Sequence, residues 1–268
     1  MAIITISRGS FSKGKEVAEK VAKQLGYQSV SREVILEAAT DFQIPQNRLD
    51  EAIHNAPSIF ERFTYEKQKY IAYVAAQILR HFKQDNVVYH GLAGHFFAPN
   101  ISHLLKVRII VNFEARVQSM REKENLSREQ AIAFLEKDDR DRKNWSYQLY
   151  GVDTSDINLY DLVVHVDKLT IDNAVDLICE AARQPQFKAT AQSQQAVEDL
   201  ALAAKTRASL IEEYPTCTVT CEAGTVSITV KASVDMDTRL SDIIKEKAMK
   251  VPGVTSVSVR LRLAGLFT

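Results

Sequence analysis

The stretch Gly9-Ser-Phe-Ser-Lys-Gly14-Lys15-Glu16 decides the fold of the first part of this chain. It follows residues 2–7, a short apolar run rich in β-branched side chains that predicts a strand. After it, residues 15–25 carry apolar side chains at helical spacing, and Gly26 stands where a left-handed helix cap is expected. A strand, a glycine-bounded loop and a helix in this order predict the opening of a parallel β-loop-α-β unit.

The two glycines and the lysine match Gly-x-x-x-x-Gly-Lys, the first seven positions of the Walker A pattern. In such a loop the backbone N–H groups surround a phosphate, glycine permits the close approach, and the helix N-terminus adds its positive end. Lys15 would reach the β- and γ-phosphates as a point charge. An ordinary glycine-containing βα turn with surface lysines is the alternative. The predicted phosphate-binding residues are Arg8, Gly9, Ser10, Phe11, Ser12, Lys13, Gly14, Lys15 and Glu16.

The position after the lysine departs from the pattern. A Ser or Thr is usual there, because its hydroxyl binds Mg²⁺, but this chain has Glu16. Magnesium must therefore be held through water, through the hydroxyl of Ser10 or Ser12, or by the Glu16 carboxylate.

Strands and helices alternate through the rest of the N-terminal part. Further strands are predicted at residues 27–30, 86–90, 106–112 and 161–166, and helices at 32–40, 46–55, 65–82, 114–124, 127–143 and 171–182. The helix over 127–143 begins with a capping-box pattern, Ser127 to Gln130. The sum is an α/β domain over residues 1–183, with a doubly wound parallel five-stranded sheet and a helical insert at 31–84.

A different pattern follows residues 184–195, whose polar composition predicts a linker. Beyond it we expect a helix, two strands around a tight Glu222-Ala-Gly224 turn, a second helix and a last strand. Their predicted ranges are 196–214, 216–221, 225–231, 238–250 and 256–263. This α-β-β-α-β order predicts a small α+β domain over residues 196–268.

Bulk properties exclude several classes of protein. Lys plus Arg equals Asp plus Glu, at 34 each, so the chain has no net charge to attract nucleic acid. No segment approaches the ~18 consecutive apolar residues of a membrane helix, and the N-terminus lacks the layout of a signal peptide. Three cysteines do not make a disulfide framework. We therefore predict a cytoplasmic protein with no nucleic-acid partner and no integral membrane segment.

The N-terminal part resembles the cytidylate-kinase-like proteins, which open with an I-x-I-S-R strand and a Ser/Gly-rich loop. Ile4-Thr-Ile-Ser-Arg8 and the Gly14-Lys15-Glu16 sequence carry that resemblance. Residues 138–142 (DDRDR), followed by Tyr160-Asp-Leu-Val163, are similar to the lid and final strand of that family. The resemblance spans residues 1–183. It implies a P-loop fold, ATP with Mg²⁺ as the phosphoryl donor, and CMP, dCMP or a similar nucleoside monophosphate as the acceptor.

Two places depart from the family's pattern. Family members often carry glycines where this loop has Phe11 and Lys13. Many also have Gly-Arg after the third strand, where this chain has Gly91-Leu92. The second change removes a positive charge near the expected phosphate site.

Phosphoryl transfer to an anionic acceptor requires alignment and charge neutralisation rather than a general base. The predicted catalytic residues are Lys15 in the loop and Arg140 and Arg142 on the lid. Because these two arginines lie two apart on a predicted helix, we expect them to face different directions unless the lid unwinds or closes. The predicted acceptor-binding residues are Arg116 and Arg121, on the helix after the fourth strand, and, by the resemblance, Arg32 and Asp41. A solvated charged face is the alternative for the arginines.

Aromatic residues of the insert allow two interpretations. Phe60, Phe63, Tyr65, Tyr70 and Tyr73 either stack a base or, as aromatics at helical spacing more often do, form a core or interface. A second group, His90, His95 and His103, lacks the spacing of a metal site, so we interpret these histidines as ordinary loop and core residues.

The C-terminal unit is similar to BON domains in its element order, in its Glu222-Ala-Gly224 hairpin and in Val251-Pro-Gly-Val254. That family suggests a ligand or lipid surface of unknown identity. Three functions are therefore open: a nucleoside monophosphate kinase, a catalytically weak nucleotide sensor that signals through the BON-like domain, or an assembly protein with the sheet as scaffold. A homodimer is compatible with each of them.

Overall fold

The computed structural model describes residues 2–31, 33–45, 64–91, 94–232 and 239–263. Contacts divide the chain into two compact units. Unit 1 comprises Met1–Glu33 and Gln84–Thr190, and unit 2 comprises Val34–Lys83 and Ala191–Thr268. Each unit is therefore built from two separate segments of the chain, and the segments of the two units alternate along the sequence.

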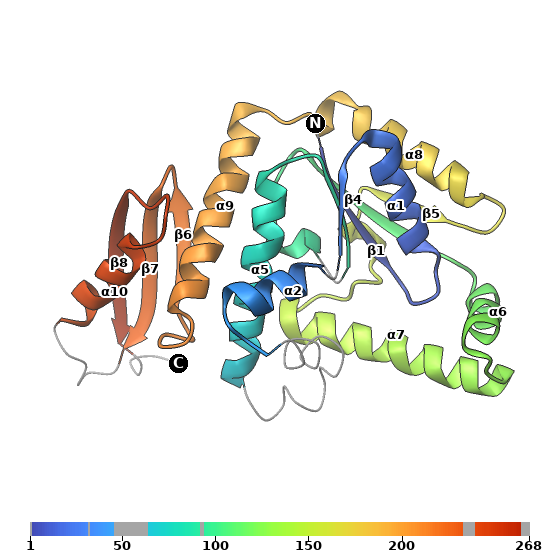
Figure 1. Cartoon of the computed structure of the whole chain (residues 1–268), viewed down its shortest axis with the longest axis horizontal. Helices are drawn as coiled ribbons and strands as arrows, with labels where there is room; N and C mark the ends of the chain where they lie inside the picture. The colour runs from blue at the N-terminus through green and yellow to red at the C-terminus, as the bar shows by residue number, and fades with distance from the viewer. Residues whose placement is uncertain (1, 32, 46–63, 92–93, 233–238, 264–268) are drawn as a thin grey trace. The chain divides into compact units, whose positions relative to one another are not determined.

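Unit 1 contains a parallel sheet of five strands in the order β2-β3-β1-β4-β5 (Figure 1). Its strands are β1 (Ile3–Arg8), β2 (Gln28–Val30), β3 (Val87–His90), β4 (Leu104–Ile110) and β5 (Leu162–His165). This confirms the predicted five-stranded parallel sheet. Strand β4 begins two residues before the predicted start, because Leu104 and Leu105 pair with Ile3 and Ile4 of β1.

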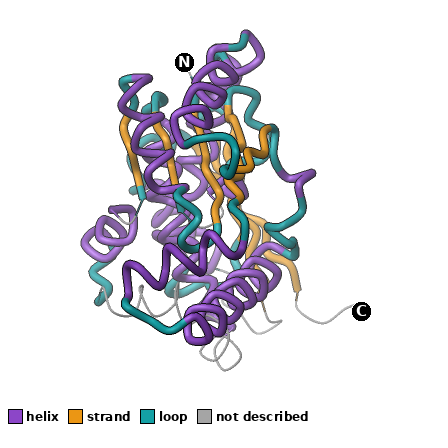
Figure 2. Tube along the Cα trace, turned by 90° about the vertical axis from the view of Figure 1, so that its right-hand side faces the viewer, coloured by secondary structure: helices purple, strands orange, loops and turns teal. Residues whose placement is uncertain are grey.

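Four helices accompany the sheet in unit 1: α1 (Gly14–Leu25), α6 (Phe113–Glu124), α7 (Arg128–Tyr150) and α8 (Ile171–Arg183). Short 3₁₀ turns cover Gly94–Phe97, Ile157–Leu159 and Pro185–Phe187. Figure 2 draws helices in purple and strands in orange. Apolar side chains of β1, such as Ile4 and Ile6, pack with Val17 and Val21 of α1 and Ile178 of α8 in one buried cluster.

Helix ends in unit 1 follow the local signals in two cases. Gly26 caps α1 with φ 69°, and Ser127 forms a reciprocal capping box with Gln130 at the start of α7. Helix α7, however, extends to Tyr150, beyond the predicted end at residue 143, and is capped by Gly151 with φ 68°. The prediction stopped early because the end signal, a glycine able to adopt a left-handed conformation, lies two turns further on.

Unit 2 contains a three-stranded sheet in the order β6-β7-β8. Strand β6 (Thr218–Glu222) is antiparallel to β7 (Thr225–Ala232), and β7 is parallel to β8 (Ser256–Leu263). Its helices are α2 (Glu33–Asp41), α5 (Thr64–Lys83), α9 (Ala191–Leu210) and α10 (Leu240–Met249). The predicted α-β-β-α-β order is confirmed. The predicted helix at 46–55 lies outside the described residues.

Helix α9 begins at Ala191, five residues before the predicted start at 196, so residues 191–195 are helical. The polar composition of these residues did not indicate a helix. The helix forms here because α9 packs along α5. Ser193 is buried, and the Gln194 side chain donates a hydrogen bond to the Lys83 carbonyl at 2.9 Å. Among the described helices, none is both long enough and apolar enough to cross a bilayer.

The insert and the C-terminal segment share one hydrophobic core in unit 2. Ala72, Tyr73 and Ala76 of α5 belong to the same buried cluster as Ile211 and Ile228. The Tyr73 ring stacks on Phe42 with 4.3 Å between centroids, and its hydroxyl donates to Glu212 at 2.6 Å. The independent folding of the predicted domains over residues 1–183 and 196–268 stays a prediction. By contacts, the insert groups with the C-terminal segment.

Core placement is therefore the observed role of Tyr73, and Tyr70 packs against the same cluster. Phe60 and Phe63 lie outside the described residues, as does the side chain of Tyr65.

His90, His95 and His103 are all buried in unit 1. Among the described residues, no group of three or more His, Cys, Asp or Glu side chains is placed to hold a metal ion. Burial lowers the pKa of His95 to about 4, with added repulsion from Lys106 and Arg108, and burial also lowers the pKa of His103. We therefore describe these two as neutral core histidines at neutral pH.

The shared core of unit 2 can be tested with Ile228→Ala, at a side chain 1% exposed on β7. We expect the free energy of unfolding of unit 2 to fall by about 2–4 kcal/mol. Because α5 belongs to the same cluster, amide hydrogen exchange should accelerate in α5 as well as in the small sheet, and not in α1. In the matched control, Ile178→Ala in the core of unit 1, amide hydrogen exchange should accelerate in α1 and stay unchanged in α5. Unchanged exchange in α5 after Ile228→Ala would contradict a shared core.

Burial of His95 predicts a pH dependence of stability. Between pH 6.5 and about 4 the unfolded chain binds a proton at His95 that the folded chain does not, so stability falls as pH falls through this window. In His95→Phe, whose ring keeps the contacts with Phe96 and Tyr160, urea unfolding at pH 7 and pH 5 should show a loss smaller by about 1–2 kcal/mol. His103 contributes equally to both proteins. Equal losses in parent and variant would show that His95 is not the responsible group.

Candidate phosphate-binding site

The predicted loop occupies residues 9–13, between the end of β1 at Arg8 and the start of α1 at Gly14. Ser12 is buried, and its hydroxyl donates a 2.6 Å hydrogen bond to the Gly9 carbonyl, which closes the loop on itself. The N-cap residue, Lys13, makes no side-chain capping bond to α1. The first-turn N–H groups of α1 therefore have no side-chain cap, which leaves them suited to bind an anion.

Two non-glycine residues of the loop adopt left-handed backbone conformations, Phe11 with φ 56° and Lys13 with φ 60°. These are the two positions where glycine is common in the family pattern. A side chain costs roughly 1–2 kcal/mol in this region because its Cβ approaches the following carbonyl. Phe11 offsets the cost by packing against Val117, Met120 and Leu135 of the α6–α7 cluster. Lys13 is exposed and has no such packing.

Gly14 is required by the close approach of the Arg8 side chain. A Cβ at this position would lie 2.5 Å from Cδ and 2.7 Å from Cβ of Arg8. The absence of a side chain at Gly14 therefore lets the Arg8 stem pass over the first turn of α1. Gly9 plays a milder part, because a Cβ there would meet the Arg116 guanidinium at 3.4 Å.

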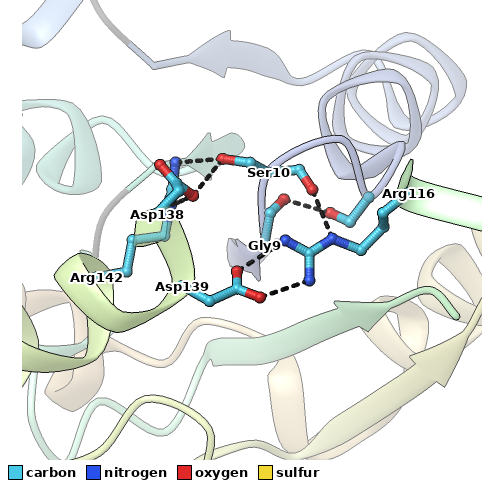
Figure 3. A network of polar contacts seen from close by, with 7 residues as sticks. Gly9, Ser10, Arg116, Asp138, Asp139 and Arg142 are labelled. Atoms are coloured by element: carbon cyan, nitrogen blue, oxygen red, sulfur yellow. Dashed lines mark hydrogen bonds and ion pairs between the residues drawn. The ribbon is translucent and has the colours of Figure 1, made fainter. Parts of the chain in front are cut away.

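Arg116 on α6 joins the loop to α7. Its Nη1 and Nη2 atoms donate to both carboxylate oxygens of Asp139 at 2.8 and 2.7 Å, and its Nε donates to the Ser10 carbonyl at 2.8 Å (Figure 3). Only 10% of the Arg116 side chain is exposed. This bidentate, charge-assisted geometry fixes the guanidinium plane, so one side chain holds three segments together.

Ser10 makes the second connection to α7. Its hydroxyl donates to Asp138 at 2.6 Å and accepts from Nη2 of Arg142 at 2.9 Å, while Nε of Arg142 donates to Asp138 at 2.7 Å (Figure 3). We call Ser10, Arg116, Asp138, Asp139 and Arg142 the Ser10 network. Through it, both the backbone and the side chain of Ser10 are tied to charged residues, so the loop and α7 are positioned together.

A cavity of about 400 Å³ opens beside the loop, at the carboxyl ends of β1 and β4. Ligands of parallel α/β sheets bind at this edge. The residues that line the cavity include six cationic side chains and two carboxylates, an excess of four positive charges. The cations are Arg8, Arg108, Arg116, Arg140, Arg142 and Lys143, and the carboxylates are Asp139 and Asp153. Such a cavity suits an anionic ligand.

Of the predicted phosphate-binding residues, Arg8, Gly9 and Ser12 line the cavity. Lys15 and Glu16 do not line it: the Lys15 side chain is 67% exposed and lies 3.6 Å from Glu19, and Glu16 lies 3.5 Å from Lys20. In this structure these two residues contribute to the loop through their place in the first turn of α1, and not through their side chains.

The predicted lid arginines, Arg140 and Arg142, both line the cavity. Helix α7 is continuous through both positions, so the expectation that the two side chains face different directions stays a prediction. The cavity runs along α7 from Asp139 to Lys143, so side chains two residues apart border the same space.

Of the predicted acceptor-binding residues that the structure describes, one lines the cavity. Arg116 lines the cavity, whereas Arg121 is exposed on α6 and contacts the Gln118 side chain. Asp41 belongs to unit 2, where it accepts hydrogen bonds from Gln77 at 2.8 Å and Arg80 at 3.1 Å. Arg32 lies outside the described residues.

Sequence reasoning missed Arg108, Lys143 and Asp153. Lys143 lies 2.7 Å from Asp153, and hydrogen bonds from Lys143 and Ser155 lower the pKa of the Asp153 carboxyl to about 2. Arg108 was overlooked inside an apolar strand. A charged residue near the carboxyl end of a buried parallel strand is the signal that could have identified it.

The strain at Lys13 predicts that Lys13→Gly raises the free energy of unfolding of unit 1 by about 0.5–1 kcal/mol, measured by urea unfolding. The matched variant Phe11→Gly removes the same backbone strain but also the packing on α6 and α7, so we expect it to be destabilising. A stability loss in Lys13→Gly would show that this left-handed residue is not strained.

Comparisons with known proteins show which family this chain is similar to. A family model described as "Cytidylate kinase-like family" matches residues 3–168. A cytidylate kinase of Sulfolobus acidocaldarius is 25% identical over 95 residues, which are 35% of this chain and 52% of that protein. A cytidylate kinase of Thermoplasma acidophilum is 27% identical over 84 residues, which are 31% of this chain and 45% of that protein. The chain thus spans about half the length of the curated relatives it matches.

Among solved structures, an uncharacterized protein from Eubacterium ventriosum is similar with a TM-score of 0.49 and 19% identity, covering 68% of this chain and 98% of that protein. The family model covers more than half of the chain and includes the loop, β4 and all of the cavity-lining residues. On that match, the chain belongs to the cytidylate kinase-like family.

Proposed function

We propose that this protein transfers a phosphoryl group from ATP to a nucleoside monophosphate, with CMP or dCMP as the first candidates. The observation that carries the proposal is the cavity beside the Gly-x-x-x-x-Gly-Lys loop, with its excess of four positive charges. Membership of the family supports the reaction class, and the names of the relatives suggest the acceptor base.

The donor phosphates are proposed to bind the backbone amides of the loop and the first turn of α1. Lys15 is then free to exchange partners, because an exposed lysine–glutamate pair contributes at most about 1 kcal/mol and the Lys15–Glu19 pair is exposed on both sides. The phosphates of ATP carry more negative charge than one carboxylate, so they would attract the Lys15 ammonium more strongly than Glu19 does.

Transfer to a monophosphate needs no general base, since the attacking phosphate oxygen is already anionic. It needs positive charge around the transferred group. Arg140 and Arg142 border the cavity from α7, and Arg116 borders it from α6. In our proposal these three guanidinium groups orient the phosphates and offset their charge.

Mg²⁺ bound with ATP would neutralise phosphate charge, and it requires only one or two protein oxygens because phosphates and water complete its shell. The Ser12 hydroxyl fits this part: it lines the cavity, and its oxygen keeps acceptor capacity while its hydrogen bonds Gly9. Glu16 does not fit in the arrangement observed, because its carboxylate pairs with Lys20 outside the cavity.

A catalytically weak nucleotide sensor is the second candidate. One observation favours it: the helical insert, where monophosphate kinases place their acceptor-binding part, shares its core with the C-terminal segment. Order in the insert would then be coupled to whatever ligand the small sheet binds. That ligand, and the resemblance of the small domain to BON domains, stay predictions.

The two functions separate in an assay of ADP formation with ATP, Mg²⁺ and a panel of monophosphates, run beside calorimetric binding of ATP. We expect ADP formation with CMP or dCMP, and Lys15→Ala should weaken ATP binding by about 2 kcal/mol, the range for a charged contact. The matched control, Lys23→Ala at an exposed lysine in the last turn of α1, should bind ATP as the parent does. ATP binding without transfer would favour the sensor. Absence of both would remove the two proposals together.

A further inference from the structure

We propose that Arg108 binds the anionic group of the acceptor. The inference rests on the proposed function, because it takes the acceptor to be a phosphomonoester. Gly91, the residue before Leu92, lines the same cavity as Arg108. The cavity at Arg108 therefore extends to the carboxyl end of β3.

The sheet places Arg108 next to the loop. Strand β4 pairs with β1, and the register sets Arg108 opposite Ser7, one residue before the end of β1. Because β1 leads directly into residues 9–13, the acceptor's anionic group at Arg108 and the donor phosphates at the loop would be neighbours. Transfer between two phosphates requires this proximity.

Neutral groups hold the Arg108 side chain. Its Nη1 donates to the hydroxyl oxygens of Ser7 and Tyr160, each at 3.3 Å, and its guanidinium carbon lies 5.5 Å from the centre of the Tyr160 ring. Tyr160 is itself fixed, since its hydroxyl donates to the Thr154 carbonyl at 2.8 Å and lies 3.0 Å from Ser7 Oγ. The arginine is thus oriented without being neutralised.

Arg108 combines partial burial with the lack of a carboxylate partner, whereas Arg140, which also lines the cavity and has no ion pair among the described residues, is exposed. In the described part of the chain, Arg116, Arg142 and Lys143 each pair with an aspartate, whereas Arg108 has no ion pair. Arg108 is also half-buried. A partly desolvated charge without a counter-charge is costly, so an anion that enters the cavity gains more at Arg108 than at a paired arginine.

The two hydrogen bonds of Arg108 both use Nη1. Toward the described residues, Nε and Nη2 therefore keep their donors for a ligand. These donors lie in the plane of the guanidinium and match two oxygens of one phosphate, which a lysine ammonium cannot do. The chemistry indicates a dianionic monoester phosphate as the bound group.

The test compares Arg108→Gln, Arg108→Lys and the parent in steady-state kinetics and in calorimetric titrations with CMP and with ATP. We expect Arg108→Gln to raise the KM and the Kd for CMP by 10- to 100-fold and to leave the Kd for ATP within twofold. Arg108→Lys keeps the positive charge but loses the paired donors of the guanidinium. Its KM and Kd for CMP should therefore lie between those of the parent and those of the Gln variant. Circular dichroism and the melting temperature check that each variant folds.

Lys106→Gln is the matched control. Lys106 lies two residues earlier on β4, so it shares the same face of the strand, but it pairs with Asp161 at 3.5 Å and does not line the cavity. Its removal should leave the CMP constants within twofold of the parent. A similar loss in Lys106→Gln would show a general effect of charge rather than a site.

Failure of this inference differs from failure of the proposed function. Unchanged CMP affinity in folded Arg108 variants of an active kinase would overturn the role of Arg108 alone. If the parent neither binds nor phosphorylates any monophosphate, the proposed function fails, and inorganic phosphate becomes the probe. Phosphate binding that weakens tenfold in Arg108→Gln would keep Arg108 as an anion-binding residue, and binding that does not depend on Arg108 would overturn it.

Discussion

The bidentate pair between Arg116 and Asp139 is the interaction on which the site depends. The same guanidinium bonds the Ser10 carbonyl, so a single side chain from α6 joins the loop and α7. With the Arg116 side chain only 10% exposed, loss of Asp139 would leave a desolvated guanidinium without its carboxylate partner, which is destabilising. The geometry of the cavity follows from this bond, because the cavity is the space between the loop, β4 and α7.

Charge in this protein is organised locally rather than globally. The chain has equal numbers of basic and acidic residues, yet the cavity carries an excess of four positive charges. Several of those cations are held by aspartates, which keep the guanidinium groups in place while no anion is bound. Arg108 is held by two hydroxyl groups instead, so its position and its charge are both available to a ligand.

Unit 2 links two segments that the sequence separates by more than a hundred residues. The insert joins the C-terminal helix and sheet in one buried cluster, and Lys69 and Tyr73 of α5 both bond Glu212. A ligand that changed the stability of the small sheet would therefore change the stability of the insert as well. This coupling follows from a common core and requires no contact between the two units.

Local signals in the sequence determined the strand, loop and helix around Gly14, the caps at Gly26 and Ser127, the five-stranded parallel sheet and the α-β-β-α-β order. Each of these depends on residues within one or two turns of one another, or on a hydrophobic period. Only the tertiary structure decided that residues 191–195 are helical and that Arg140, Arg142 and Arg108 border one cavity. These features depend on strand register and on packing between distant segments, which no local pattern encodes.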